Sequence, residues 1–457
     1  MIVNKFGGEI MGDPQLVKLA VKNIKSQLKA GQEPVVVVSA LKGVTDLLVE
    51  LCERYDQQKV DRLWNLHEKW LSKFQMSKSK CQIKSKCQIS NLFNHLLRDA
   101  KMIRSVKNKA VVRDRVLAYG EKWASLLFTE LLRQNGILAV RFTGEELGII
   151  TDDNFGDANV LYAQSVKEIR TQIKSEKLKV KSEKCKSKGK SRYIVPVITG
   201  FIGINRRGQT TTLGRGGSDT TACLVGAALS ASKVILWKNV AGVLSADPKI
   251  VRDVKSVKAL NYEEAEESGK VIHDKAMRSV RQAGITVEVS YIQNPRQKTV
   301  ITRYGSNAKA GVKIISSKDK LRLLVITGDK IKHPGALLEI ANIISPDKIG
   351  INMVLIRNTM DSLYIVVEKN SHNFNLAERQ IQKFNYELRC QNVSMINVIG
   401  RLDWHTVEKV NHLLHSYYSE ACLGAFPYHN CVRLEVVVES EQVKKLVKIF
   451  HKEFIES

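Results

Sequence analysis

The sequence predicts an α/β protein in which a mainly parallel sheet, covered by helices, is followed by two ferredoxin-like units. Three observations predict this fold class. The first 40 residues read as strand, loop, helix and strand, and the strand Val35–Val38 is a continuous β-branched run. After about residue 308, an order of strand, helix, two strands, helix and strand appears and then begins again. The 457 residues suffice for two to four domains.

The N-terminal part opens with a short apolar strand, Ile2–Lys5, which Gly7 and Gly8 end. Apolar residues at helical spacing predict a helix from about Asp13 to Ala30. The run Val35–Val38 predicts a strand that is buried on both faces. The remaining predicted helices of this part are 46–75, 91–135 and 217–230, and the remaining predicted strands are 193–200, 233–237 and 286–291.

The C-terminal part predicts two units of similar order. The first consists of strands at 321–327, 350–356, 362–367 and 386–390 with helices after 335 and from 376. The second has strands at 395–400, 420–427 and 432–438 with helices at 406–416 and 443–450, and it lacks a last strand. The apolar stretch Val312–Ile315 is a candidate for that strand. We therefore expect domains at 1–308, 309–392 and 393–457.

Composition excludes several classes of protein. No stretch approaches 18 consecutive apolar residues, and the N-terminus lacks the apolar core and small-residue cleavage site of a signal peptide, so we expect a cytoplasmic protein without membrane spans. The eight cysteines include no C-x-x-C pair, and the histidines form no zinc-binding spacing. Free thiols in a reducing compartment and no protein-held metal site are expected.

The formal net charge of +26 has a local origin. The stretches 77–90 and 173–192 are rich in Lys, and together they carry +11 of this charge. A nucleic-acid partner is one interpretation, but neither stretch interleaves aromatic residues that could stack on bases. The tandem repeat of KSKCQI at 78–83 and 84–89 favours solvated, low-complexity insertions. A basic surface also attracts anionic substrates.

Two motifs follow the first two strands. In Lys5-Phe6-Gly7-Gly8, glycines allow a phosphate to approach the backbone, and Lys5 supplies a charge to neutralise it. The alternative is an ordinary tight turn. The segment Ser39–Thr45 offers two hydroxyls and a glycine to a small polar ligand, whereas the alternative interpretation makes Thr45 a helix N-cap.

Two further motifs lie later in the chain. Gly214–Asp219 combines three glycines, a cation and a carboxylate between a strand and a helix, which suits recognition of a carboxylate by Arg215. The alternative is a tight turn with Asp219 in the first helical turn. The segment Trp237–Val243 places Lys238 where a nucleotide could bind. No Walker A or protein-kinase signature is present, and the motifs indicate phosphoryl transfer by positioning and charge stabilisation, with Mg²⁺ bridging the nucleotide phosphates.

Taken in order, these motifs resemble those of the aspartokinases, in the amino-acid kinase family. The resemblance rests on KFGG, the Ser39–Thr45 segment, Gly120-Glu121, Thr151–Phe155 and above all Gly200–Ala222. It implies the amino-acid kinase fold, an αβα sandwich, followed by two ACT domains that interleave, with a segment before the first completing the second. It covers nearly the whole chain except the Lys-rich stretches.

The resemblance implies a reaction and a set of roles. The chain would phosphorylate the side-chain carboxylate of L-aspartate with ATP and Mg²⁺, at the entry to lysine, threonine and methionine biosynthesis. Lys5 would stabilise the transferring phosphoryl group, and Asp219 would organise the catalytic centre. The residues implied to hold aspartate are Ser39, Thr45, Glu121 and Arg215. Those implied to bind the nucleotide are Gly7, Gly8, Gly216, Gly217, Lys238, Asn239, Lys249 and Lys270. Lysine or threonine would bind the ACT domains of a homodimer or higher homo-oligomer as effector.

Departures from the family pattern fall mostly on the nucleotide side. Glu9 and Ile10 follow KFGG where Thr and Ser are usual, and Lys238-Asn239 replace Thr-Asp. The family pattern has Tyr, Arg and Pro at the positions that Leu244, Lys249 and Asp274 occupy here. In the first ACT unit, this chain has Val354 where lysine-binding members have an Asp. Two alternatives therefore accompany the aspartate kinase hypothesis: a kinase-fold amino-acid sensor with weak catalysis, and another amino-acid kinase acting on glutamate or uridylate.

Overall fold

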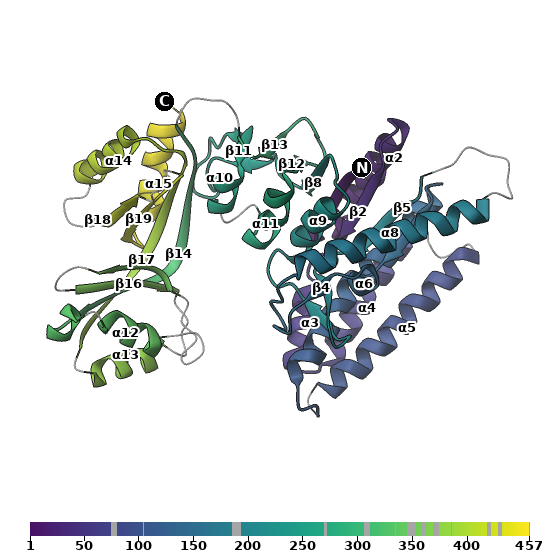
Figure 1. Cartoon of the computed structure of the whole chain (residues 1–457), viewed down its shortest axis with the longest axis horizontal. Helices are drawn as coiled ribbons and strands as arrows, with labels where there is room; N and C mark the ends of the chain where they lie inside the picture. Colours follow the sequence, from purple (N-terminus) through teal and green to yellow (C-terminus); the bar gives the residue numbers. More distant parts are fainter. Residues whose placement is uncertain are drawn as a thin grey trace. The chain divides into compact units, whose positions relative to one another are not determined.

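The computed structural model describes residues 1–456 except 75–79, 104, 185–192, 269–271, 306–310, 334, 345–352, 359–361, 369–373, 385, 418–421 and 428–431 (Figure 1). The chain forms two compact units. The first consists of Met1–Val243 and Ser256–Asn307, and the second of Leu244–Lys255 and Ala308–Ser457. Among the described residues, no helix combines the length and the apolar character needed to cross a bilayer.

The first unit contains the predicted mainly parallel sheet. Its eight strands lie in the order β11-β13-β12-β8-β1-β2-β5-β3, and every described pairing is parallel except that of β12 with β13. The strands are β1 (Ile2–Phe6), β2 (Pro34–Val38), β3 (Ala139–Phe142), β5 (Val195–Thr199), β8 (Lys233–Lys238), β11 (Ala259–Asn261), β12 (Thr286–Tyr291) and β13 (Lys298–Thr302). A small sheet holds β4 (Ile150–Thr151), β6 (Ile202–Asn205) and β7 (Thr210–Thr212), while β9 (Val243–Leu244) pairs with β10 (Ser256–Val257).

Helices cover this sheet, as expected for buried parallel strands. They are α1 (Gly8–Gly12), α2 (Pro14–Lys29), α3 (Val44–Glu53), α4 (Gln57–Lys73), α5 (Lys80–Met102), α6 (Lys109–Gln134), α7 (Gly144–Leu147), α8 (Tyr162–Lys184), α9 (Gly217–Ala228), α10 (Tyr262–Glu267) and α11 (Asp274–Ala283). Helix α2 matches its prediction, because Asp13 caps its first turn and Ala30 ends it. Helices α5 and α8 extend into the two Lys-rich stretches, of which residues 77–79 and 185–192 lie outside the described part.

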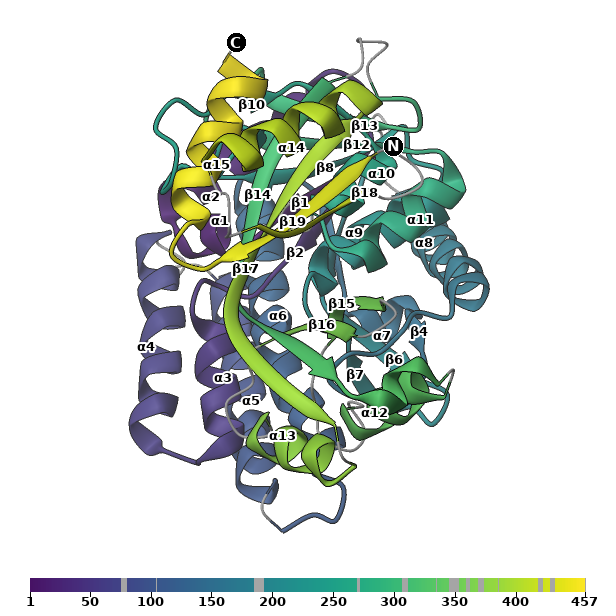
Figure 2. The ribbon, with the colours of Figure 1, turned by 90° about the vertical axis from the view of Figure 1, so that its left-hand side faces the viewer.

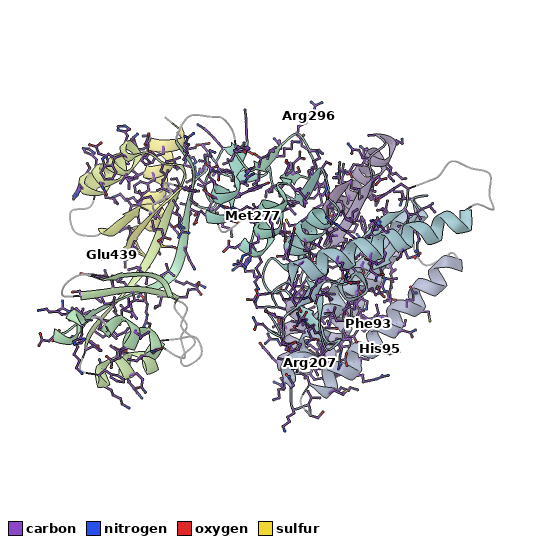
Figure 3. The ribbon with its side chains drawn as sticks, in the orientation of Figure 1. Phe93, His95, Arg207, Met277, Arg296 and Glu439 are labelled. Atoms are coloured by element: carbon purple, nitrogen blue, oxygen red, sulfur yellow. The ribbon has the colours of Figure 1, made fainter. Side chains whose placement is uncertain are left out.

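An aromatic cluster joins the helices on one face of this sheet. Phe93 of α5, labelled in Figure 3, stacks on Trp123 of α6 with ring centroids 4.5 Å apart. His67 of α4 lies against the same indole at 4.6 Å. Burial lowers the pKa of His67 to about 4, so this imidazole is neutral and acts as part of the core. Burial of these rings holds α4, α5 and α6 together.

The second unit is built on one antiparallel sheet in the order β15-β16-β14-β17-β19-β18. Its strands are β14 (Gly311–Thr327), β15 (Met353–Asn358), β16 (Ser362–Glu368), β17 (Glu387–Arg401), β18 (Cys422–Pro427) and β19 (Arg433–Glu439). Helices α12 (Ala336–Ile344) and α13 (Phe374–Lys383) accompany one half, and α14 (Trp404–Tyr417) and α15 (Val443–His451) the other (Figure 1). Short turns of helix, Asp329–Lys332 and Lys452–Glu456, complete the unit.

The two halves have the predicted ferredoxin-like order and are interleaved. Val312 and Ile315 of β14 pair with Gly400 and Val398 of β17, which supplies the strand that the second half lacks. That prediction is confirmed. The prediction of separate strands at 312–315 and 321–327, and at 386–390 and 395–400, is wrong. Each pair forms one long strand, because the β14–β17 ladder absorbs the intervening residues in a register shift near Lys318.

Residues 244–255 leave the first unit and pack within the second. Ala246 and Val251 belong to the core that also contains Ile315 and Phe450. The Ser245 hydroxyl lies 2.8 Å from Nε2 of the buried His451. The segment is thus part of the folded core of the second unit rather than a free loop.

We predict that Ile315→Ala lowers the free energy of unfolding by about 2–5 kcal/mol, the usual range for truncating a buried isoleucine. Ile315 is fully buried between the second half of the sheet and α15. Urea denaturation followed by circular dichroism measures this change. Lys444→Ala, at an exposed position of α15, is the control and should change stability little. A loss no greater than that of the control would contradict the packing described for β14.

Candidate active site

Most of the candidate residues meet in one pocket of about 350 Å³ in the first unit. It lies at the carboxyl ends of β1 and β2, beside the N-terminus of α9. In open α/β sheets this edge is where ligands bind. The candidate residues that line the pocket are Lys5, Gly8, Ser39, Thr45, Glu121, Gly216, Gly217 and Asp219.

The loops after β1 and β2 are fastened to each other by their backbones. The Ser39 N–H donates to Phe6 O at 3.1 Å, and the Lys42 N–H donates to Gly8 O at 3.0 Å. A Cβ added at Gly8 would lie 2.9 Å from Ala40 O, so only glycine allows this approach. The loop after β1 and the Ser39–Thr45 segment therefore form one wall of the pocket.

Thr45 lines this wall and does not cap a helix. Helix α3 begins at Val44 with Gly43 as its N-cap, and no side chain caps it. Gly43 has φ +81°, which is why a glycine rather than Thr45 occupies the cap position. The capping interpretation of Thr45 is wrong, and its side chain is half-buried at the pocket.

Glu121 reaches the pocket from the middle of α6. A Cβ added at the preceding Gly120 would lie 2.9 Å from Cβ of Ala40, so a glycine lets the helix come close to the loop after β2. Glu121 Oε1 accepts the N–H of Ala40 at 3.2 Å, and Oε2 has no hydrogen-bond partner within the described chain. Burial raises the pKa of Glu121 to about 8, against the opposing effects of the Ala40 hydrogen bond and Lys5. The hydrogen bond and the charge of Lys5 therefore offset only part of the cost of burying this carboxylate.

Two lysines surround the carboxylate of Asp219. Lys5 Nζ lies 2.6 Å from Oδ1 and Lys238 Nζ 3.5 Å from Oδ2. Burial alone would raise the pKa of Asp219, but the two ammonium charges outweigh it and hold the pKa below its usual value. Burial, opposed by Asp219, lowers the pKa of Lys238. The cluster carries one net positive charge at the pocket, which suits an anionic ligand.

Arg215 lies between two pocket-lining glycines, with its side chain exposed and outside the pocket wall. Gly214 and Gly216 have φ of +70° and +73°. A Cβ at Gly214 would overlap Oδ1 of Asp157, and one at Gly216 would lie 2.5 Å from Cβ of His273. Asp157 is itself held by Lys275, whose Nζ lies 2.6 Å from Oδ1. The turn that carries Arg215 is therefore closely confined.

The other nucleotide-binding candidates are not gathered in this pocket. Gly7 is the N-cap of α1, next to the pocket-lining Gly8. Asn239 is exposed, accepts a hydrogen bond from Gln293 and lines a separate pocket. Lys249 is exposed within the 244–255 segment of the second unit. Lys270 lies outside the described residues.

The motifs did not reveal Asp114, which is buried in α6. Its Oδ2 accepts the N–H of Gly156 at 2.9 Å and that of Thr212 at 2.7 Å. Burial raises the pKa of Asp114 despite these bonds. The carboxylate fixes the loop after β4 and the strand that precedes Gly214. The signal in the sequence that could have indicated this role is a charged residue on an otherwise apolar face of the helix.

The described residues contain no preformed group of side chains that could hold a metal ion. No cluster of three or more His, Cys, Asp or Glu side chains with metal-binding geometry occurs among those residues. The Asp219 carboxylate is occupied by two lysines.

Comparison with known proteins defines the class of this chain. A profile of the amino acid kinase family matches residues 1–290, and the chain belongs to that family. Aspartokinase 2 of Arabidopsis thaliana, a chloroplast protein, is 27% identical over 480 residues, spanning 100% of this chain and 84% of the relative. The aspartokinase of Rickettsia felis is 27% identical over 422 residues, spanning 90% and 88%.

Solved structures share the fold over the full length. E. coli aspartokinase III in complex with aspartate and ADP superposes with a TM-score of 0.79 at 22% identity, covering 99% of each chain. The same enzyme in complex with lysine and aspartate gives a TM-score of 0.77 at 23% identity, covering 100% of this chain and 99% of the other. The amino-acid kinase fold with its C-terminal units, expected from the sequence, is confirmed.

We predict that Glu121 makes stability depend on pH. Its pKa in the folded protein is raised from 4.5 to about 8, so the protonated group favours folding at low pH. That contribution is lost as the pH rises from about 4.5 through 8. Compared with Glu121→Gln, the unmodified protein should lose stability between pH 5 and pH 8 in urea denaturation. Glu68→Gln, at an exposed position, should show no such trend. A constant difference between the protein and Glu121→Gln would contradict the buried, unpaired state of Glu121.

Proposed function

We propose that this protein is an ATP-dependent aspartate kinase that forms 4-phospho-L-aspartate. Family membership and the similarity to aspartokinases along the whole chain support this function. The observation that carries it is the pocket itself, which is lined by Lys5, by Asp219 and by the Glu121 carboxyl group, whose Oε2 has no hydrogen-bond partner in the described chain. Lys238 adds a second positive charge beside Asp219. The two lysines suit a phosphate, and Glu121 suits an ammonium group.

In this proposal Glu121 receives the α-ammonium group of aspartate. Its Oε2 has no partner in the described structure, and a bound cation would lower the raised pKa and stabilise the ionised form. The hydroxyls of Ser39 and Thr45 provide hydrogen bonds to the polar ligand. Arg215 binds the α-carboxylate through a bidentate pair of hydrogen bonds. This contact requires its exposed side chain to turn toward the pocket.

The chemical step needs no general base. The side-chain carboxylate of aspartate is ionised at neutral pH, because its ordinary pKa is about 3.9. One of its oxygens attacks the γ-phosphorus of ATP, the bond to the β–γ bridging oxygen breaks, and ADP leaves with that electron pair. Lys5 neutralises charge on the transferring group, and Asp219 positions Lys5. The glycine backbones of the loops after β1 and before α9 provide space for the phosphates.

Mg²⁺ is proposed to arrive with the nucleotide. When bound, the ion neutralises and bridges the phosphate oxygens. The carboxylates at the pocket do not form a preassembled cage for it, so the phosphates would supply most of the ligands. Gly7, Gly8, Gly216, Gly217, Lys238 and Asn239 remain our proposed nucleotide contacts, with Lys249 and Lys270 completing the set.

We infer that the second unit holds two ACT domains, at 309–392 and 393–457, that bind an amino-acid effector in a homodimer. E. coli aspartokinase III has been crystallised with lysine, and it shares this fold. Lysine and threonine are the candidate effectors for this chain. The 244–255 segment, which joins the nucleotide-side strand β8 to the core of the second unit, supplies a covalent route for coupling.

Replacing Lys5 tests the kinase. With Mg-ATP and L-aspartate, ADP release and hydroxamate trapping of the acyl phosphate should both occur. Lys5→Ala should lower kcat by about a hundredfold or more, because a charge aimed at the transferring group is lost. Lys18→Ala, at an exposed position of α2, is the matched control. Circular dichroism establishes that the variant is folded.

The same assay separates the main alternative. Aspartate-independent ADP release, or phosphorylation of glutamate or uridylate in place of aspartate, would contradict the proposed substrate. No turnover, together with calorimetric binding of aspartate or of an effector, would favour the amino-acid sensor. The departures from the family pattern at Lys238 and Asn239 support that alternative.

Lys238→Thr tests the second cation, since Thr is the residue that the aspartokinase pattern has there. We expect KM for ATP to rise about tenfold, because one charge-assisted phosphate contact is removed, while KM for aspartate changes little. Initial-rate kinetics with each substrate varied in turn gives both values. A rise confined to KM for aspartate would contradict a nucleotide-side role for Lys238.

A further inference from the structure

A second, larger pocket lies beside the catalytic one. Its volume is about 690 Å³, and it is enclosed by α1, the first turn of α2 and the last turns of α4. In Figure 2 the end of α4 points toward α1 and α2. Leu41 and Lys42 line both pockets, so the two share a wall. The volume falls within the range of small-molecule sites. Of the residues given a role above, Asn239 lines this pocket, whereas the lysines of α4 that line it have no role there.

The pocket has two cations without a counter-charge. Lys69 and Lys73 are four residues apart on α4 and therefore point to the same side of the helix. No carboxylate of the described chain lies within ion-pair distance of either. The acids at the pocket are occupied, because Glu9 pairs with Lys42 at 3.3 Å and Asp13 caps α2 through the N–H groups of Gln15 and Leu16.

Two apolar residues of α4 also line the pocket. Leu66 and Trp70 lie on the same face of α4 as the lysines, and Leu66 is 38% exposed although it is a large apolar residue. Trp70 is buried, and its indole N–H donates to Met11 O at 2.9 Å. This bond fastens α4 to α1, so the pocket exists before any ligand enters.

We propose that this pocket binds a small organic dianion that carries an apolar group. Lys69 and Lys73 would hold the two negative charges, and the apolar part would cover Leu66 and Trp70. The N–H groups at the start of α2 are already capped by Asp13, so the lysines are the anion-binding groups. Aryl phosphate monoesters and aryl dicarboxylates share this chemistry.

Because the two pockets share a wall, a ligand in the second pocket would regulate binding in the catalytic pocket. The Lys42 N–H is bonded to Gly8 O, and Leu41 and Lys42 lie within the Ser39–Thr45 segment that lines the catalytic pocket. A ligand against these two residues shifts the position of that segment, and the expected effect is on KM for aspartate rather than on kcat. This coupling rests on the proposed kinase function, whereas the binding site itself does not.

Calorimetry with the full chain tests the site directly. Phenyl phosphate and phenylsuccinate are titrated in the presence of saturating aspartate and Mg-ADP, which occupy the catalytic pocket. We expect at least one of them to bind with one site per chain, and the tighter of the two identifies the preferred anion. Inorganic phosphate and benzyl alcohol, which lack the apolar group and the charge respectively, should bind more weakly.

A pair of double variants locates the binding. Lys69→Gln/Lys73→Gln should weaken binding about tenfold or more, since two charge-assisted contacts are lost. Lys22→Gln/Lys29→Gln removes the same charge from exposed positions of α2 and should leave binding unchanged. Absence of binding by both aryl dianions, an equal loss in both double variants, or equal affinity for benzyl alcohol would overturn the site.

Kinetics then tests the coupling separately. Addition of the dianion that binds should change KM for aspartate in the unmodified protein and in Lys22→Gln/Lys29→Gln, and not in Lys69→Gln/Lys73→Gln. Binding without a change in KM would retain the site and overturn its regulatory role. If the chain had no kinase activity, calorimetry would still decide whether the pocket binds anions.

Discussion

The buried ion pair between Lys5 and Asp219 is the interaction on which the arrangement of the first unit depends. Two charges removed from water cost several kcal/mol each, and only a close, exact geometry repays this cost. The side chains come from β1 and from the first turn of α9, and they meet at 2.6 Å. Strand β1 lies inside the sheet between β2 and β8, so its carboxyl end has the loop that begins at Ser39 on one side and Lys238 on the other. The pair therefore fixes the point at which β1 and the first turn of α9 meet at the pocket.

Glycines make this convergence sterically feasible. Gly8 admits the carbonyl of Ala40, Gly120 brings α6 against the same loop, and Gly216 turns the chain into α9 beside His273. A side chain at any of these positions would push apart two elements that have to touch. Gly8 and Gly216 themselves line the resulting pocket. Charge is then added at a few points, by Lys5, Asp219 and Glu121.

The second unit is governed by a different constraint, the continuity of β14 and β17. Because both strands run through the whole sheet, the two ferredoxin-like halves share their central ladder. The backbone hydrogen bonds of this ladder therefore join the two halves directly. Residues 244–255 bury Ala246 and Val251 in the core of the second half. The chain that follows β8 thus depends for its conformation on the packing of the second unit.

The sequence by itself determined the fold class, most elements and the residues of the main pocket. Hydrophobic periodicity and glycine positions are local signals, which is why α2, β2 and the Gly214–Asp219 turn could be read directly. Only the tertiary structure decided that β14 and β17 are continuous, that residues 244–255 belong to the second unit, and that Asp114 holds two loops. It also decided that Lys69 and Lys73 line the same pocket as Lys42. These features depend on which distant segments meet, and contacts between distant segments leave no periodicity in the chain.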